Sequence, residues 1–308
     1  MGGTSGTGGM FYGIINQSCA RPLVCSSVSC CMKTSIPSGS FIMGTDTDPD
    51  RHSNESPTHL TTLDSYIMDK FEVTVGRFRS YYQAYDGTLP TADSGAHPEH
   101  ADSGWQTNFA ANMPASKSEL QSQINCNTGQ YQTWTNSVGT HENMPMNCVS
   151  WYVAFAFCIW DGGRLPTEAE WEMAASNGSS KNKFPWGNSD PDPAADAVMS
   201  CLGDGIVGCG TADILPVGSR SAGANYWGNQ DLAGSMWEFA VDYYDEAYYT
   251  SVGTCNNCIN LTSSSPGWRV IRGGDFSSSA GLIRSTERTS YQPVTVSPYV
   301  GFRCVLNH

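Results

Sequence analysis

Clear patterns of apolar and polar positions occupy only a few short stretches of this chain. Residues 36–44 and 66–74 each place apolar side chains over a length typical of a strand, with turn residues beside them. The second stretch leads into a helical pattern from Val75 to Tyr82. A nearly continuous apolar run from Tyr152 to Trp160 predicts a buried helix, which ends where an aspartate and two glycines follow.

One further helix has a clear start. Thr167 is followed three residues later by Glu170, the pattern of a capping box in which each residue satisfies a backbone N–H of the other. Glu168, Glu170 and Glu172 lie at the positive end of this helix, where its dipole favours carboxylates. We therefore interpret the three glutamates as structural and not as catalytic groups or metal ligands.

Long parts of the chain lack periodicity. Residues 86–143 are polar and rich in small residues, which predicts surface loops, and from Lys181 onward short strands with glycine turns fit best. Residues 1–34 read as a flexible, cysteine-rich segment ahead of one domain, residues 35–308.

Core packing is the default for any one aromatic side chain, but those on loops are candidates to stack on sugars or to anchor a protein partner. These are Trp105, Trp134, Tyr243, Tyr244, Tyr248 and Tyr249.

Charge and hydropathy exclude some partners. Acidic residues outnumber basic ones by 29 to 16, so nucleic acid and anionic bilayers would be repelled at long range. No apolar run approaches the roughly 20 residues that a transmembrane helix needs. The glycine-rich opening, residues 1–9, reads as a flexible tether of the kind that follows the lipid-bearing cysteine of a bacterial lipoprotein, or as a vector-derived linker.

Twelve cysteines, an even number without zinc-site spacing, favour disulfides and an oxidising compartment. We therefore expect an extracellular, periplasmic or cell-surface protein. Cys126 and Cys148 are one candidate pair. Cys255 and Cys258 have the spacing of a redox motif, but no βαβ pattern surrounds them, so a small structural disulfide is favoured.

Five short motifs follow one another along the chain. They are RLPTEAEWE from Arg164, FPWGN from Phe184, DLAGSMWEF from Asp231, RGGDF from Arg272 and GFRC from Gly301. In this order they resemble the formylglycine-generating enzyme (sulfatase-modifying factor) family, over roughly Ser35 to the C-terminus. The resemblance implies an α+β fold related to the C-type lectin fold, with little regular secondary structure, two central helices and a small antiparallel sheet. It also implies a disulfide between Cys158 and Cys304.

The resemblance does not extend to the family's catalytic residues. Active members use two cysteines, five positions apart after the RGGS motif, to bind copper(I), whereas Ser278 and Ile283 stand at those positions here. A hydroxyl and an alkyl group cannot replace two thiolates, so we expect neither copper nor formylglycine-generating activity. The hypothesis is that the groove that holds a sulfatase peptide in the enzymes holds another ligand. Candidate residues on or near its wall are Ser278, Ile283, Arg284, Glu287 and Arg288.

The segment from Asp231 to Glu238 predicts a structural calcium site. Two acids flank a glycine turn, so their side chains and the carbonyls of Gly234 and Met236 can converge on a hard cation. The similar segment of the family holds calcium. The alternative is that Asp231 caps a turn and Glu238 pairs with an arginine.

The family's second calcium site would use Asp196 and the carbonyl of Ala197. A downstream acid, Asp204 or Asp213, would complete it. Acidic loops are common without an ion, so this second site is the less specific of the two.

Three functions fit these observations. The first is an exported, disulfide-stapled, calcium-holding module that binds an unknown protein, peptide or glycan. The second is an oxygen-dependent metallo-oxidase whose ligands have moved, for example to His97, His100 or an unpaired cysteine. The third is a structural cell-surface or filament protein that self-assembles through its cysteines and aromatic loops.

Overall fold

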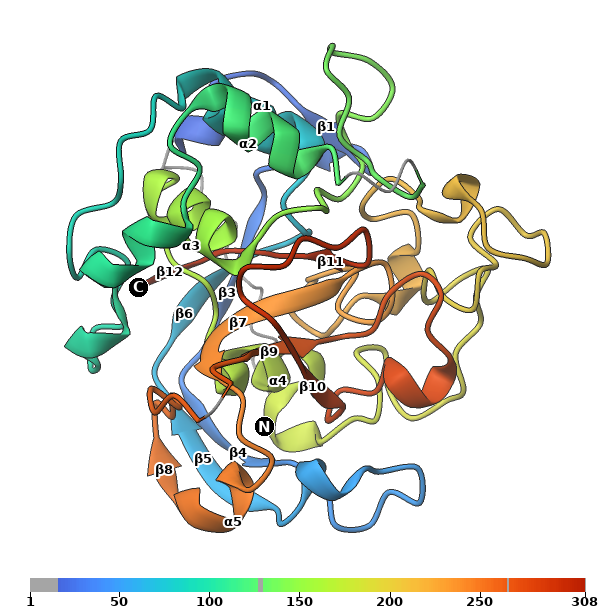
Figure 1. Ribbon diagram of the computed structural model, residues 1–308. Helices are drawn as coiled ribbons and strands as arrows, with labels where there is room; N and C mark the ends of the chain where they lie inside the picture. Colours follow the sequence, from blue (N-terminus) through green and yellow to red (C-terminus); the bar gives the residue numbers. More distant parts are fainter. Residues whose placement is uncertain (1–15, 127–129, 265, 308) are drawn as a thin grey trace, which may run out of the picture.

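Short elements joined by long loops make up this protein (Figure 1). The computed structural model describes residues 16–126, 130–264 and 266–307. The α-helices are α1 (Val75–Ala84), α2 (Lys117–Ile124), α3 (Trp151–Trp160), α4 (Glu168–Ala175) and α5 (Tyr248–Val252). The strands are β1 (Val24–Cys25), β2 (Val28–Ser29), β3 (Lys33–Ile36), β4 (Gly39–Met43), β5 (His59–Leu63), β6 (Tyr66–Asp69), β7 (Trp237–Tyr243), β8 (Cys255–Asn256), β9 (Arg269–Arg272), β10 (Arg288–Tyr291), β11 (Val300–Gly301) and β12 (Val305–Asn307).

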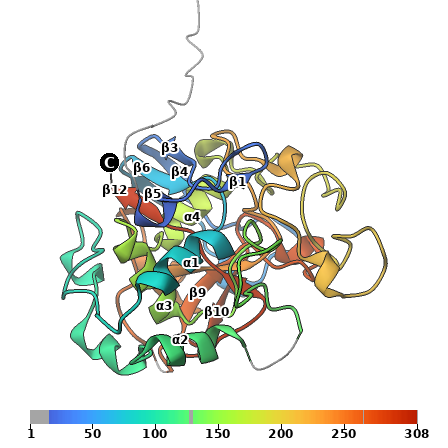
Figure 2. The same cartoon turned by 90° about the horizontal axis from the view of Figure 1, so that it is seen from above.

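The strands form several small sheets. The largest has the order β10-β9-β7-β11, in which β9 runs antiparallel to both neighbours and β11 runs parallel to β7. Two three-stranded sheets have the orders β12-β6-β3 and β4-β5-β8, and β1 pairs with β2. Helices α1, α2 and α3 lie together in one half of the molecule, away from β4 and β5 (Figures 1 and 2). The expected α+β fold with limited regular structure is confirmed.

Both predicted central helices are present, and their sequences explain their starts. The Ser150 side chain accepts a hydrogen bond from the backbone of Val153 at the start of α3. At α4 the predicted capping box forms, because the Thr167 hydroxyl accepts from the Glu170 N–H (3.0 Å) and the Glu170 carboxylate accepts from the Thr167 N–H (2.8 Å). Indole N–H groups then attach both helices to β7: Trp151 donates to the Ala240 carbonyl, and a tryptophan of α4 donates to Glu238.

The region from 86 to 143 differs from the prediction. It contains α2, which is capped by Ser116, since the Ser116 side chain accepts from the Glu119 N–H. Trp105 and Trp134 are 1% and 2% exposed and belong to the main core, so they are not surface anchors for a ligand. Among the other aromatic candidates Tyr249 is also buried, at 1% exposed. Tyr243, Tyr244 and Tyr248 are half-buried.

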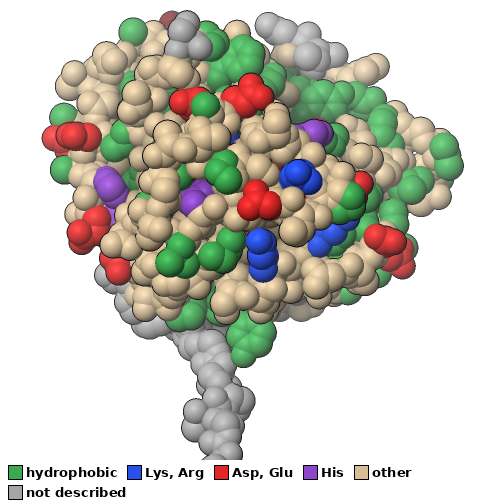
Figure 3. Space-filling view, turned by 90° about the horizontal axis from the view of Figure 1, so that it is seen from below, with side chains coloured by type: hydrophobic (Ala, Val, Ile, Leu, Met, Phe, Trp, Pro, Cys, Tyr) green, Lys and Arg blue, Asp and Glu red, His purple; other side chains and the backbone are tan. Residues whose placement is uncertain are grey.

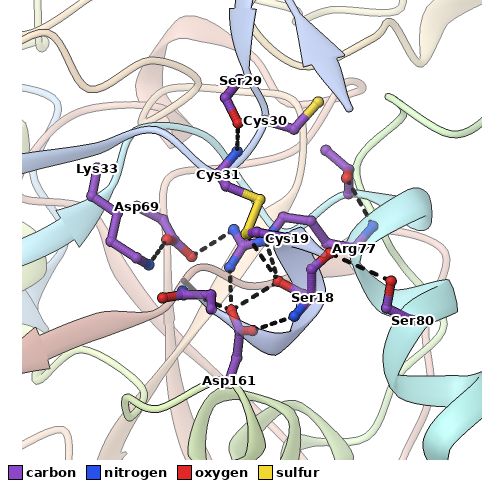
Figure 4. The surroundings of a disulfide bond; sticks show 12 residues. Ser18, Cys19, Ser29, Cys30, Cys31, Lys33, Asp69, Arg77, Ser80 and Asp161 are labelled. Atoms are coloured by element: carbon purple, nitrogen blue, oxygen red, sulfur yellow. Dashed lines mark hydrogen bonds and ion pairs between the residues drawn. A yellow bond between two sulfur atoms is a disulfide. The ribbon is translucent and has the colours of Figure 1, made fainter. Parts of the chain in front are cut away.

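The described part of the N-terminal segment is tied to the domain through Arg77 of α1 (Figure 4). Its guanidinium donates to Asp69 (2.9 Å) and Asp161 (2.8 Å), and its Nε donates to the Ser18 hydroxyl (3.1 Å). The Ser18 N–H also donates to Asp161 (2.7 Å), and the Cys19–Cys31 disulfide lies beside this cluster. The domain boundary near residue 35 stays a prediction, and the glycine-rich residues 1–9 lie outside the described residues.

All twelve cysteines form disulfides. The pairs are Cys19–Cys31, Cys25–Cys30, Cys126–Cys148, Cys158–Cys304, Cys201–Cys209 and Cys255–Cys258. In the part of the chain that the structure describes, no helix has the length and apolar character needed to cross a membrane. On the side that carries β8 and α5, acidic side chains are scattered across the face, and basic side chains lie together in one part of it (Figure 3).

Candidate functional site

Ser278 and Ile283 lie close together after β9, beside the same glycine. A Cβ added to Gly274 would lie 2.6 Å from Ile283 Cγ2 and 3.2 Å from Ser278 Cβ. Gly274 has φ +74°, a conformation that favours glycine, and the missing side chain leaves room for both neighbours. The fold therefore brings the two positions together, as expected for positions that form a pair.

Neither side chain offers a ligand for a soft metal. The Ser278 hydroxyl accepts from the Asp275 N–H (3.0 Å), and Ile283 is fully buried. Ile283 packs in a small apolar cluster with Phe184, Ala197, Met199 and Ala233. Since every cysteine is in a disulfide, no thiol can substitute for the missing pair.

Arg284 and Glu287, expected near a groove wall, lie inside a buried ionic network. Arg284 donates to both oxygens of Glu55 (2.6 and 2.7 Å) and to Glu287 (2.9 Å). The carboxylate of Glu287 also contacts His52 Nδ1 at 2.9 Å. Burial, and then the negative charge of Glu55, raise the pKa of Glu287 to about 7.

Arg288 is enclosed in the same way. It donates to both oxygens of Glu168 (2.6 and 2.9 Å) and is 1% exposed. Ser278, Ile283, Arg284, Glu287 and Arg288 are all 5% exposed or less. This corrects the expectation that they line an open groove, because apolar packing and paired charges hold them below the surface. A ligand role for them stays a prediction.

A surface pocket of about 350 Å³ opens next to this network. Thr286 lies between Arg284 and the pocket, since its hydroxyl donates to Glu55 (2.6 Å) and the residue also lines the opening. The other lining residues are Thr45, Thr47, Asp48, Pro49, Lys181, Asn182, Lys183 and Asn188. Through Thr286 this pocket borders the buried network that contains the predicted groove residues.

One group of side chains in the network has metal-ligating atoms close together. Ligand atoms of His52, Glu55 and Glu287 lie within 4.8 Å of one another. The guanidinium of Arg284 contacts both carboxylates of the group, however, and its positive charge opposes a cation there. The geometry therefore fits an ion pair network better than a metal centre.

Glu238, a predicted calcium ligand, pairs with an arginine. Both of its oxygens accept from Arg303 (2.6 and 2.7 Å), and one also accepts from the Trp171 indole (3.0 Å). All three side chains are fully buried. For Glu238 the structure thus contains the arginine pair that was the alternative to calcium.

The surroundings of Asp231 nevertheless contain more buried carboxylates than cations. Asp231 has φ +62° and accepts from the Gly218 N–H (2.7 Å). Burial is the main cause that raises the pKa of Asp231 to about 6 and the pKa of Glu72 well above its usual range. Asp231 and Glu238 further raise the pKa of Glu72, and the charge of Arg303 acts on all three acids. A bound cation would relieve this repulsion.

The second predicted calcium site has one unsatisfied acid. Asp213 is fully buried, and its Oδ2 accepts from the Gly210 N–H (2.7 Å), while Oδ1 has no partner among the described residues. Asp204, the other candidate, is exposed, and Asp196 is half-buried. The side chain of Arg220 links the loop that contains Asp196 to the loop that contains Asp204, since it donates to the carbonyls of Pro193 (2.8 Å) and Gly203 (2.9 Å). The orphaned oxygen favours Asp213 as the third ligand.

The two histidines that were candidate oxidase ligands lie side by side, with ring centroids 5.5 Å apart. His97 is buried, and burial, followed by the charge of Arg164, lowers its pKa to about 4. Its Nδ1 accepts from the Glu99 N–H (3.2 Å). His97 is therefore a neutral, hydrogen-bonded side chain within the fold.

Comparisons with known proteins agree with the motifs. The family description "Sulfatase-modifying factor enzyme 1-like domain" matches residues 26–308. The formylglycine-generating enzyme of Mus musculus is 29% identical over 289 residues, which cover 89% of this chain and 74% of the mouse protein. The inactive C-alpha-formylglycine-generating enzyme 2 of the same species is 28% identical over 297 residues, covering 87% and 83%. The solved structure of PvdO from Pseudomonas aeruginosa shares the fold, with a TM-score of 0.66 and 21% identity over 99% of this chain and 100% of that one.

Proposed function

Since the chain belongs to the sulfatase-modifying factor enzyme 1-like family, we propose that it is an exported ligand-binding member that does not generate formylglycine. One observation carries the proposal: Ser278 and Ile283 occupy the two positions that hold copper-binding cysteines in active members. Both side chains are enclosed, and all cysteines are in disulfides. The relative named inactive C-alpha-formylglycine-generating enzyme 2 supports the idea that the family fold exists without the activity.

The test is a conversion assay on a cysteine-containing sulfatase peptide, with copper(I) and oxygen supplied. We expect the peptide mass to stay unchanged with this protein and to change with the mouse formylglycine-generating enzyme as positive control. Conversion by the unaltered protein would overturn the proposal. A Ser278→Cys/Ile283→Cys variant tests the assignment of the two positions, because adjacent thiolates should bind one copper(I). A folded double variant that binds none would show that the positions were assigned wrongly.

The ligand we propose is a protein, peptide or glycan that binds at the pocket beside Thr286. The lining pairs basic Lys181 and Lys183 with Asp48, so it offers donors and acceptors of both signs. Lys183 contacts Asp48 at 3.8 Å and Asp50 at 2.9 Å at the rim. Binding screens should compare the protein with a Lys183→Glu variant, and equal binding by both would place the ligand elsewhere.

The proposal includes structural calcium, supported by the unpaired Asp213 Oδ1 and by the excess of carboxylates around Asp231. Added calcium should raise the thermal midpoint relative to the chelator-treated protein, because an ion that binds only the folded state stabilises it. Asp213→Asn should reduce this shift. Asp204→Asn is the matched control, since Asp204 is exposed, and it should leave the shift unchanged. Equal shifts in both variants would remove the second site.

Export is proposed from the six disulfides, since such bonds persist in oxidising compartments. The metallo-oxidase alternative would use the group of His52, Glu55 and Glu287, where Arg284 contacts both carboxylates. Metal analysis separates the two functions: stoichiometric copper or iron would favour an oxidase, whereas calcium alone would favour the binding module. Concentration-dependent assembly in size-exclusion chromatography would favour a structural protein.

A further inference from the structure

Arg269, the first residue of β9, is a buried arginine without an acidic partner among the residues that the structure describes. It is 2% exposed, and its one hydrogen bond runs from Nη1 to the carbonyl of Val241 (2.5 Å). Its buried Nε has no partner in the described structure. The other buried arginines of the described chain each pair with a carboxylate: Arg77, Arg79, Arg164, Arg272, Arg284, Arg288 and Arg303. The guanidinium of Arg269 therefore keeps an unused edge.

Two aromatic rings hold this guanidinium in place. Its Cζ lies 3.7 Å from the centroid of Trp151 and 3.5 Å from that of Tyr243. Because both faces are covered, new hydrogen bonds can form only in the plane of the group. Val241 already uses Nη1 and Nε is buried, so Nη2 is the donor that remains for an oxygen in the pocket.

Arg269 lines a pocket of about 310 Å³, comparable with the liquid volume of roughly ten water molecules. The pocket lies between the start of β9 and the loop with the 3₁₀ helices Ala101–Ser103 and Thr107–Asn112. Phe109 and Leu261 supply apolar wall, and Asp102 and Gln106 supply polar wall. It is distinct from the Ser278 region, which follows the other end of β9.

We propose that this pocket binds a small organic monocarboxylate. The carboxylate accepts from Nη2 of Arg269, and the apolar body lies against Phe109 and Leu261. A monoanion is favoured over phosphate or a dicarboxylate, because Asp102 lines the pocket and the whole chain carries a net charge of −13. This site does not depend on the proposed function, since it shares no residue with the Ser278 region or the Thr286 pocket.

A benzoate titration of the unaltered protein, measured by calorimetry at constant ionic strength, tests the proposal. We expect a Kd of about 1 mM or tighter, which is reasonable for a ligand of roughly nine non-hydrogen atoms. Benzamide, a neutral molecule of the same shape, should bind at least about tenfold more weakly. Benzoate should also shift the Arg269 Nε–H resonance in ¹H–¹⁵N spectra. No heat and no shift at saturating benzoate would overturn the proposal, as would equal binding of benzamide.

Two variants locate the site. Arg269→Lys keeps the charge but loses the planar guanidinium, so benzoate should bind about 10- to 100-fold more weakly. Leu261→Trp fills the pocket and leaves Arg269 in place, so a folded Leu261→Trp protein should also lose binding. Arg51→Lys, at an exposed arginine, is the control and should bind like the unaltered protein. Unchanged benzoate affinity in folded Leu261→Trp would refute the location.

Discussion

Removal of the Cys158–Cys304 disulfide should destabilise this protein more than removal of any short-range disulfide. The bond joins the end of α3 to the segment between β11 and β12, across a sequence separation of 146. Both residues are buried, at 0% and 1% exposed. The chain around them therefore cannot relax easily into solvent when the bond is removed. The change to test is Cys158→Ala/Cys304→Ala.

The loop length sets the expected magnitude. Chain-entropy arguments give about 5 kcal/mol for a loop of this size at 25 °C. The matched control is Cys25→Ala/Cys30→Ala, which removes a bond between two fully buried cysteines with a sequence separation of only 5. The same relation gives about 2 kcal/mol for that short loop. The difference between the two variants is therefore about 3 kcal/mol.

Equilibrium unfolding in guanidinium chloride, with the remaining disulfides intact, measures both free energies. The slopes should be compared as well, because removal of the long crosslink lets the unfolded chain expand and expose more surface. If the two variants lose the same free energy, or if Cys25→Ala/Cys30→Ala loses more, loop-closure entropy does not govern the stability that these bonds provide. The reasoning would then fail even if both variants were less stable than the unaltered protein.

Two further predictions concern buried charges. Arg288→Met should cost about 3 to 5 kcal/mol, because it leaves the Glu168 carboxylate buried without its guanidinium, and the second change Glu168→Leu should restore part of that loss in urea unfolding. Burial, and then the charge of Glu168, raise the pKa of Asp242 to about 7. The folded protein therefore keeps a proton on Asp242 that the unfolded chain loses near pH 4, so this group's contribution to stability falls as pH rises from 4 to 7. Relative to Asp242→Asn, the unaltered protein should lose on the order of 4 kcal/mol over this range, and a constant difference between the two would contradict the raised pKa.

Local signals in the sequence predicted α3 from its apolar run and α4 from its capping box. The apolar run of α3 has no polar face, as a fully buried helix requires. The capping box of α4 is formed by Thr167 and Glu170, two residues at the start of that helix. Helix α2 was missed although Ser116 and Glu119 carry the same capping spacing. The polar composition around it outweighed that signal. The burial of Trp105 and Trp134 depends on α3 and α1 packing beneath them, which no local pattern records.

The candidate site was predictable only in part for a similar reason. The replacement of the cysteine pair by Ser278 and Ile283 is visible in the sequence. The partners of Arg284 and Glu287 are not, because Glu55 lies more than two hundred positions away. An unpaired atom such as Asp213 Oδ1 or Arg269 Nε is harder still to predict, because it is recognised only by the absence of a hydrogen-bond partner among all its neighbours. Such groups become visible only when all hydrogen bonds of the fold are known.

The ion pairs between motifs explain why the family fold does not depend on the catalytic positions. Two glutamates of the α4 motif bind arginines from elsewhere: Glu168 pairs with Arg288, and Glu172 pairs with Arg272 of the RGGDF motif. In the same way Glu238 of the DLAGSMWEF motif pairs with an arginine of GFRC. Ser278 and Ile283 contribute a hydroxyl that accepts a backbone N–H and an apolar side chain in a small cluster, contacts that other residues could provide. The motifs therefore report on the scaffold, and the proposed loss of activity rests on Ser278 and Ile283 rather than on the motifs.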